Sequence, residues 1–149
     1  MLLDEIDKKI LNMLLQSGRI SYTDIAKAVD MKPPSVIDRI KKLEHEGIIK
    51  GYTTSVDYKK LGYDLTAFIG IVIDNPDHIS QLEGQLNNID EGIVRCYHVT
   101  GDFTLILQVI TENTNTLAAI INHIRAMPGV IRSNTILIFS TMLDRVRQI

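Results

Sequence analysis

The fold of this chain is decided by residues 21–47, which read SYTDIAKAVDMKPPSVIDRIKKLEHEG. Ser21 precedes a short amphipathic stretch and an acid follows three residues later, a pattern typical of a helix N-terminus. The proline pair at 33–34 suits the first turn of a second helix, where its missing N–H groups would have no partner anyway. Gly47 ends that helix. Two short helices joined by a turn of a few residues predict a helix-turn-helix.

Residues 4–19 predict a further helix ahead of this pair. Asp4 is the expected N-cap, with Asp7 at the third helical position, and apolar residues recur on one face as far as Leu14. A three-helix bundle with an ordinary charged surface would show the same stripes. The proline-fixed start of the last helix, and the side chains that it turns outward, favour a major-groove reader. The expected outward residues are Ser35, Asp38, Arg39, Lys41 and Lys42.

Charge is distributed unevenly along the chain. The net charge is −2, which by itself argues against a nucleic acid as partner. Residues 1–60 nevertheless contain 11 Lys and Arg against 9 Asp and Glu, whereas residues 61–149 contain 5 against 9. All nine lysines lie in the first sixty residues. This asymmetry indicates a polyanion-binding part joined to an acidic one, although a solvated lysine-rich surface remains the alternative.

Double-stranded DNA is the expected partner of the N-terminal part. Arg39 can bind a guanine edge with two hydrogen bonds, and Asp38 and Lys42 can instead pair along the helix. Ser21 and Tyr22 lie at a helix N-terminus, which favours a phosphate, although capping alone also explains Ser21. Lys32 and Lys50 would contact phosphates irrespective of sequence. The expected DNA-binding residues are Ser21, Tyr22, Lys32, Ser35, Arg39, Lys41, Lys42 and Lys50.

The second part alternates strand and helix patterns in the order β-α-β-β-α-β, which is the ferredoxin-like arrangement. Gly101-Asp102 predicts a two-residue turn. The fold class is therefore α+β: three helices containing a helix-turn-helix, then a ferredoxin-like domain. We place the domains at 1–60 and 61–149. The expected strands are 48–57 as a link, then 65–74, 93–100, 103–111 and 130–142, and the expected helices are 77–88 and 114–127.

The predicted strands are apolar on both faces. In the first strand of this domain Ile69 and Ile71 alternate with Phe68 and Val72. One face packs on the helices, and a large exposed apolar patch usually marks an interface. We therefore expect two sheets to pack face to face in a homodimer.

Several stretches together carry a family likeness, although none is specific alone. They are Leu3–Asp7, Ile10-Leu11, Gly18–Ser21, Arg39–Glu44, Gly47–Tyr52, Val99–Phe103 and Met127–Val130. In this order and spacing the chain resembles the Lrp/AsnC, or feast/famine, family of bacterial and archaeal regulators over essentially its whole length. The resemblance implies a DNA-binding transcriptional regulator with a ligand-sensing domain, often called RAM. It also implies dimers that commonly assemble to octamers, with amino acids as effectors bound near dimer–dimer contacts.

Three positions depart from the family pattern. Lys32 stands where the family often has Ser or Thr to cap the recognition helix. Asp30 replaces a frequent Gly, and Asp tolerates left-handed geometry better than most residues. Thr104 stands where many members carry a second acid, which puts amino-acid sensing in doubt.

The expected effector site is centred on the turn at 99–104. A glycine turn leaves backbone N–H groups free for a ligand carboxylate, and Asp102 can take its ammonium group. A plain hairpin turn, with Asp102 bonded to its own backbone, is the alternative. The resemblance adds Ser133 and Thr135 on the last strand. The full set is Tyr97, His98, Val99, Thr100, Gly101, Asp102, Thr104, Ser133 and Thr135.

Other functional classes find little support. Cys96 is the only cysteine and the four histidines lack metal-ligand spacing, so we expect no metal, no cofactor and no catalytic residues. No apolar run approaches the ~20 residues that span a bilayer, and a cytoplasmic protein is expected. Two alternatives remain: a DNA-organising protein with little sequence preference and no effector, and a haem-pathway decarboxylase of related fold.

Overall fold

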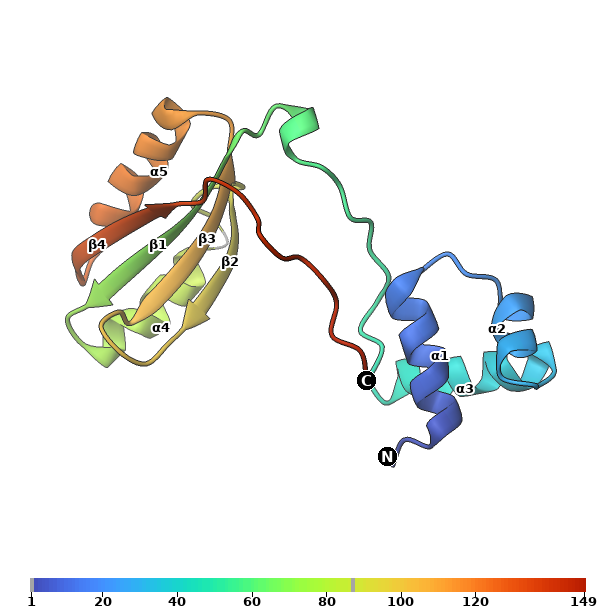
Figure 1. The fold of residues 1–149 in the computed structure, drawn as a ribbon. Coiled ribbons are helices and arrows are strands. Elements are labelled where there is room, and N and C mark those ends of the chain that lie inside the picture. Colours follow the sequence, from blue (N-terminus) through green and yellow to red (C-terminus); the bar gives the residue numbers. More distant parts are fainter. Residues whose placement is uncertain (1, 87) are drawn as a thin grey trace. The chain divides into compact units, whose positions relative to one another are not determined.

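The computed structural model describes residues 2–86 and 88–149 and divides into two compact units. The first unit contains the chain up to Ser55 together with Leu143–Ile149, and the second is Val56–Met142 (Figure 1). We expected a boundary after residue 60, and these units divide the chain after residue 55 and again after residue 142. The final segment joins the first unit because the Asn12 side-chain amide donates to Ile149 O at 2.9 Å and its oxygen accepts from Ile149 N at 2.8 Å.

The first unit is the expected three-helix bundle. Its helices are α1 (Glu5–Gln16), α2 (Tyr22–Ala28) and α3 (Pro33–His45). Local signals fix each boundary: Asp4 caps α1 in a capping box, Ser21 caps α2, and two prolines open α3. The buried core consists of Ile10, Ile25, Ala26, Val36 and Ile40.

The turn between α2 and α3 has the geometry that its sequence suggested. Asp30 adopts a left-handed conformation with φ 54°, which Asp tolerates better than most residues. Lys32 is the N-cap of α3 and makes no capping hydrogen bond with its side chain. Gly47, with φ 69°, follows the C-cap Glu46.

The linking strand expected at 48–57 is wrong. Residues 50–57 are exposed and form no strand, and a short 3₁₀ helix, η1 (Lys59–Leu61), follows them. A strand needs a neighbour for its N–H and C=O groups, and the described residues of this chain offer none to this segment.

The second unit is a four-stranded antiparallel sheet with two helices. Its elements are β1 (Leu65–Ile73), α4 (Pro76–Leu86), β2 (Ile93–His98), β3 (Leu105–Thr111), α5 (Thr114–Arg125) and β4 (Val130–Leu137). The strand order β2-β3-β1-β4 confirms the ferredoxin-like arrangement. The last strand ends at Leu137 rather than residue 142, because the pairing with β1 ends there. The helix expected at 77–88 ends at Leu86, and residue 87 lies outside the described residues.

Both helices cover the same face of the sheet (Figure 1). Ala67, Ile69 and Ile71 of β1 point into this core, which also buries Leu82 of α4 and Ile120 of α5. Successive side chains along each strand point to opposite faces of the sheet. The other face of the sheet carries the remaining apolar side chains of the strands. No described element of this unit covers it, and we call it the open face.

Candidate DNA-binding and ligand-binding sites

The recognition helix α3 has one buried stripe and one exposed face. Val36, Ile40 and Leu43 are buried, and residues three or four positions apart share a helix face. The opposite face is fully accessible, and it combines two lysines with one acid and small polar groups. Its exposed residues are Pro34, Ser35, Asp38, Lys41, Lys42 and His45.

Arg39 does not lie on this exposed face, which corrects its expected outward direction. Its Nη1 donates to Asp4 Oδ2 at 2.7 Å and to Asp7 Oδ1 at 2.7 Å. The side chain of Arg39 is 29% exposed and that of Asp7 only 5%. Hydrogen bonds first to Asp4 and then to Asp7 raise the pKa of Arg39. The guanidinium group is therefore held by α1.

The two aspartates are also the capping box of α1. Asp4 Oδ1 accepts from Asp7 N at 2.8 Å, and Asp7 Oδ2 accepts from Asp4 N at 3.2 Å. Each carboxylate thus uses one oxygen for the helix start and the other for Arg39. The Asp7 backbone hydrogen bond, with Arg39 second, lowers the pKa of Asp4.

The remaining residues expected to contact DNA differ in their surroundings. Ser21 Oγ accepts from Asp24 N at 3.0 Å, so its capping role is confirmed. Lys32, Lys41, Lys42 and Lys50 are exposed, as is Tyr22. Among the ion pairs of the described residues, none joins Asp38 to Lys42.

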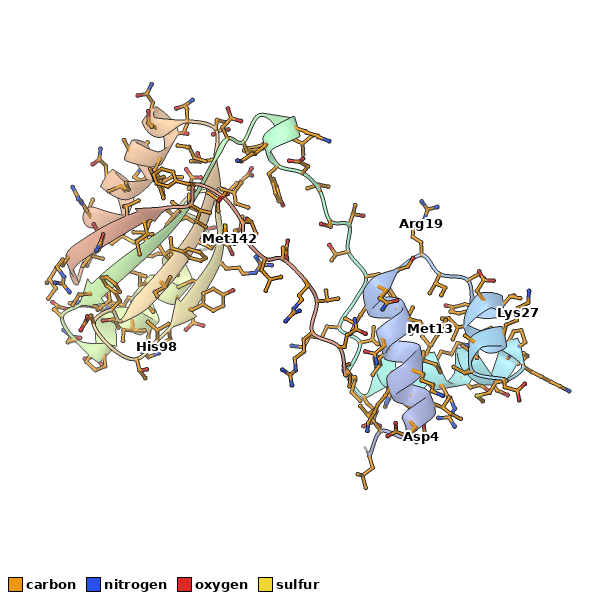
Figure 2. The ribbon with its side chains drawn as sticks, in the orientation of Figure 1. Asp4, Met13, Arg19, Lys27, His98 and Met142 are labelled. Atoms are coloured by element: carbon orange, nitrogen blue, oxygen red, sulfur yellow. The ribbon has the colours of Figure 1, made fainter. Side chains whose placement is uncertain are left out.

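Two further basic residues of this unit escaped the sequence argument. Arg19 lies in the turn before α2 and Lys27 lies on α2 (Figure 2). Arg19 and Lys27 are both exposed. A plot of charge around each helix would have found Lys27, whereas Arg19 lies between helices α1 and α2.

The segment after α3 is anchored by Tyr52. Its hydroxyl donates to Glu44 Oε1 at 2.8 Å. Burial, and then the Glu44 carboxylate, raise the pKa of Tyr52 to about 12. This bond ties the irregular chain at 50–57 to the C-terminal half of α3.

The turn that was expected to bind an effector is longer than a two-residue turn. β2 ends at His98 and β3 begins at Leu105, and Val99 N donates to Thr104 O at 3.0 Å to close the loop. Gly101 has φ 103°, which requires glycine. Thr100, Gly101 and Asp102 are exposed.

Two polar side chains of this turn differ in availability. In the described part of the chain no hydrogen bond or ion pair involves the Asp102 carboxylate, so the self-bonded alternative is not observed. Thr104 is committed to the sheet: its N donates to Ile71 O at 2.7 Å and its Oγ1 accepts from Ile73 N at 3.0 Å. The latter bond lies where the β1–β4 register shifts.

The other expected effector residues do not gather at one point. Tyr97 precedes His98 on β2, so the two side chains face opposite sides of the sheet. Figure 2 labels His98. Ser133 pairs with Ile71 across the β1–β4 ladder, so its side chain lies on the helix-covered side, where its Oγ accepts from Arg125 Nε at 3.1 Å. Thr135 pairs with Ile69 and lies on that side as well.

The open face carries an apolar depression of about 390 Å³. A Cβ on Gly70 would lie 2.7 Å from the Phe103 ring, so glycine makes room for that ring. The Arg132 guanidinium lies 5.8 Å from the ring centroid, within cation–π range. The depression is lined by Phe68, Gly70, Tyr97, Val99, Phe103, Ile106 and Ile136.

A second hollow of about 650 Å³ lies beside η1 and the start of β2, where the sequence indicated no site. Tyr58 and Tyr63 meet edge to face there, with ring centroids 6.1 Å apart. Three carboxylates line it, those of Asp90, Glu91 and Glu112. The residues that line this hollow come from 58–63, 90–94 and 110–116. These stretches are far apart in sequence, and the periodicity of each one does not reveal that they meet.

No group of three or more His, Cys, Asp or Glu residues in residues 2–86 and 88–149 is arranged to hold a metal ion. In the same residues no helix has the length and apolar character needed to cross a membrane.

Known proteins match both units. Residues 3–50 match the winged helix-turn-helix DNA-binding family, and residues 66–148 match the Lrp/AsnC ligand binding domain. An HTH-type transcriptional regulator of Pyrococcus abyssi is 33% identical over 146 residues, which cover 98% of each chain. The structure of Escherichia coli AsnC has a TM-score of 0.91 at 26% identity and covers 99% of both chains. A transcriptional regulator of Neisseria meningitidis, solved as a complex with L-Met, has a TM-score of 0.91 at 22% identity, covering 97% of this chain and 94% of that one.

Proposed function

Because this chain belongs to the Lrp/AsnC family of transcriptional regulators, we propose that it binds specific DNA sequences as a homodimer and that a small effector at the second unit modulates this binding. The relatives are transcriptional regulators rather than enzymes. The decarboxylase alternative is therefore set aside.

The exposed face of α3 is the observation that carries the DNA-binding proposal. Lys41 and Lys42 give it net positive charge against Asp38, and Ser35 adds a short hydroxyl near the helix start. A major groove admits one α-helix, and its base edges accept hydrogen bonds from such side chains. Lys32 and Lys50, both exposed, are suited to phosphates.

The open face of the sheet supports the homodimer. Ile136 is 53% exposed and Tyr97 is 47% exposed, and both line the apolar depression. An exposed apolar surface of this kind is typical of a protein interface. Ile136→Glu should give a folded monomer in sedimentation experiments. Ile131→Glu, at a position on the same strand that is 66% exposed and outside the depression, should remain dimeric. A dimeric Ile136→Glu variant would contradict this interface.

The turn at 99–104 is the proposed effector site, and an amino acid is the proposed ligand. Asp102 offers an exposed carboxylate without a partner in the described chain for an ammonium group, and Gly101 keeps the backbone accessible. The Neisseria regulator of the same fold was solved with L-Met. Since the turn is open to solvent in one chain, a second copy would have to complete the site. This fits assembly beyond the dimer, toward the octamer that the family resemblance implies.

Thr104 favours a second candidate function, that of a DNA-organising protein without an effector. Its hydroxyl is committed to Ile73 N, and it supplies no second acid to the turn. Screening the twenty amino acids at millimolar concentration separates the two candidates. A thermal shift that Asp102→Asn removes supports sensing. No shift with any amino acid supports the second candidate.

DNA binding itself is tested on the sequence upstream of the protein's own gene, at several salt concentrations. We expect a preference of ~10³ or more over random duplex. Lys42→Ala should lower the slope of log affinity against log salt by about 0.9 if Lys42 contacts a phosphate. Lys59→Ala, an equal loss of charge on η1, is the matched control and should leave the slope unchanged. Equal affinity for target and random DNA would refute sequence-specific regulation.

A further inference from the structure

We propose that Arg39 reads no base and is instead a positioning residue, which fixes the recognition helix α3 against the capped start of α1. The inference rests on the proposed DNA binding by α3. It assigns to Arg39 a role that depends on α1, and it leaves base contacts to the exposed face of α3.

The position of Arg39 on α3 is the first argument. It lies three residues after Val36 and four before Leu43, and both of these are buried. Residues at these spacings are neighbours on a helix surface. Arg39 therefore lies beside the buried stripe, whereas Asp38 and Lys42 share the opposite, exposed face.

The hydrogen bonding of Arg39 is the second argument. Its Nη1 has two hydrogens, and the two 2.7 Å bonds to Asp4 and Asp7 use both. The other oxygen of each carboxylate is occupied by the capping box. The bonds join residues 35 and 32 positions apart in sequence, so they link the start of α1 directly to the middle of α3.

Charge is the third argument. Two carboxylates and one guanidinium group give this cluster a net charge of −1, which repels a phosphate at close range. Asp7 is almost fully buried, with 5% of its side chain exposed. Removing Arg39 would leave that carboxylate without its partner, and such a buried charge is strongly destabilising. Moving Arg39 to a DNA base would have the same consequence.

The two roles predict different patterns of DNA binding. A base reader confers discrimination at one base pair. A positioning residue instead sets the placement of the whole exposed face. Its loss should therefore weaken binding by the same factor for the target site and for each site that carries a single base change. Because no phosphate contact is lost, the salt slope stays that of the wild type.

The experiment is a double-mutant cycle with Arg39→Ala, Asp7→Asn and the double variant, at a temperature where circular dichroism shows each to be folded. We expect each single variant to weaken DNA binding by a similar factor, on the order of tenfold, with little further loss in the double variant. Arg39→Lys keeps one charged donor and should recover part of the loss. It also serves as the second variant if Arg39→Ala does not fold.

Two results would overturn the proposal. One is loss of discrimination at a single base pair in Arg39→Ala while Asp7→Asn binds as the wild type does. The other is a salt slope lowered by about 0.9 in Arg39→Ala alone, which means a phosphate contact. If the wild type shows no sequence preference, the proposed function fails. The same cycle measured by thermal unfolding then still tests the link, because independent effects of Arg39 and Asp7 on the melting temperature would contradict it.

Discussion

Replacing Gly70 with alanine tests how tightly Phe103 packs on the open face of the sheet. Gly70 lies in β1, and a Cβ built there would be 2.7–2.8 Å from three atoms of the Phe103 ring. Carbon atoms at optimal separation lie about 3.5–4.0 Å apart. The ring would therefore have to move by roughly an ångström.

Two opposing effects determine whether Gly70→Ala raises or lowers the free energy of unfolding. In a strand interior alanine is normally more stable than glycine by roughly 0.5–1 kcal/mol. Overpacking typically costs ~1–3 kcal/mol. We therefore expect Gly70→Ala to lower the free energy of unfolding by about 1–2 kcal/mol. At ~4–8 °C per kcal/mol for a domain of this size, the melting temperature should fall by several degrees.

Thermal unfolding measures the effect, and Gly84→Ala is the matched control. Gly84 lies in α4 with open space around its Cβ position, so alanine should stabilise the protein by roughly 0.5–1 kcal/mol there. In the Gly70→Ala background, Phe103→Ala should cost less than it does in the wild type, since it also removes the overlap. A Gly70→Ala variant at least as stable as the wild type would refute this packing argument.

Three further outcomes are expected. The lowered pKa of Asp4 means that its contribution to stability is present above the unfolded value of 3.8 and is lost as the pH falls through the lower folded value. The difference in urea midpoint between wild type and Asp4→Asn should therefore shrink below about pH 4. For Tyr52 the sign is opposite: stability is lost as the pH rises from 10 through about 12, and Tyr52→Phe should lack that loss in alkaline urea titrations. Finally, Thr104→Val leaves the Ile73 N–H without its acceptor and should cost ~1–3 kcal/mol in thermal unfolding, whereas Thr104→Ser should cost less.

The features that the sequence predicted correctly depend on residues close together in the chain. Asp4, Ser21 and Gly47 act within a few residues of their own position, and each marks the helix boundary that the structure shows. The ferredoxin-like order followed from alternating patterns of period two and 3.6. Such signals require no knowledge of what packs against them.

The features that the sequence did not reveal depend on partners that are distant in sequence or outside the chain. Arg39 has the hydrogen-bond donors of a base reader, and only the folded bundle brings it to Asp7, 32 residues away. Thr104 meets Ile73 across 31 residues. Residues 48–57 have the side chains of a strand, yet hydrogen bonding to a neighbour makes a strand, and the described chain has no neighbour for them.

The charge of the exposed face of α3 gives a reason why the proposed homodimer would matter for DNA binding. With Arg39 bound to α1, the exposed face of α3 has Lys41 and Lys42 against Asp38. The two cations of this face by themselves supply little sequence-independent attraction, because that attraction grows with the number of phosphates neutralised. Two copies of the chain joined through the open faces of their sheets would bind two half-sites at a high effective concentration. This can raise the affinity for DNA by ~10²–10⁴ without any new contact. Loss of the sheet interface, as in Ile136→Glu, should therefore weaken DNA binding more than loss of any one lysine on α3, although Ile136 belongs to the other unit.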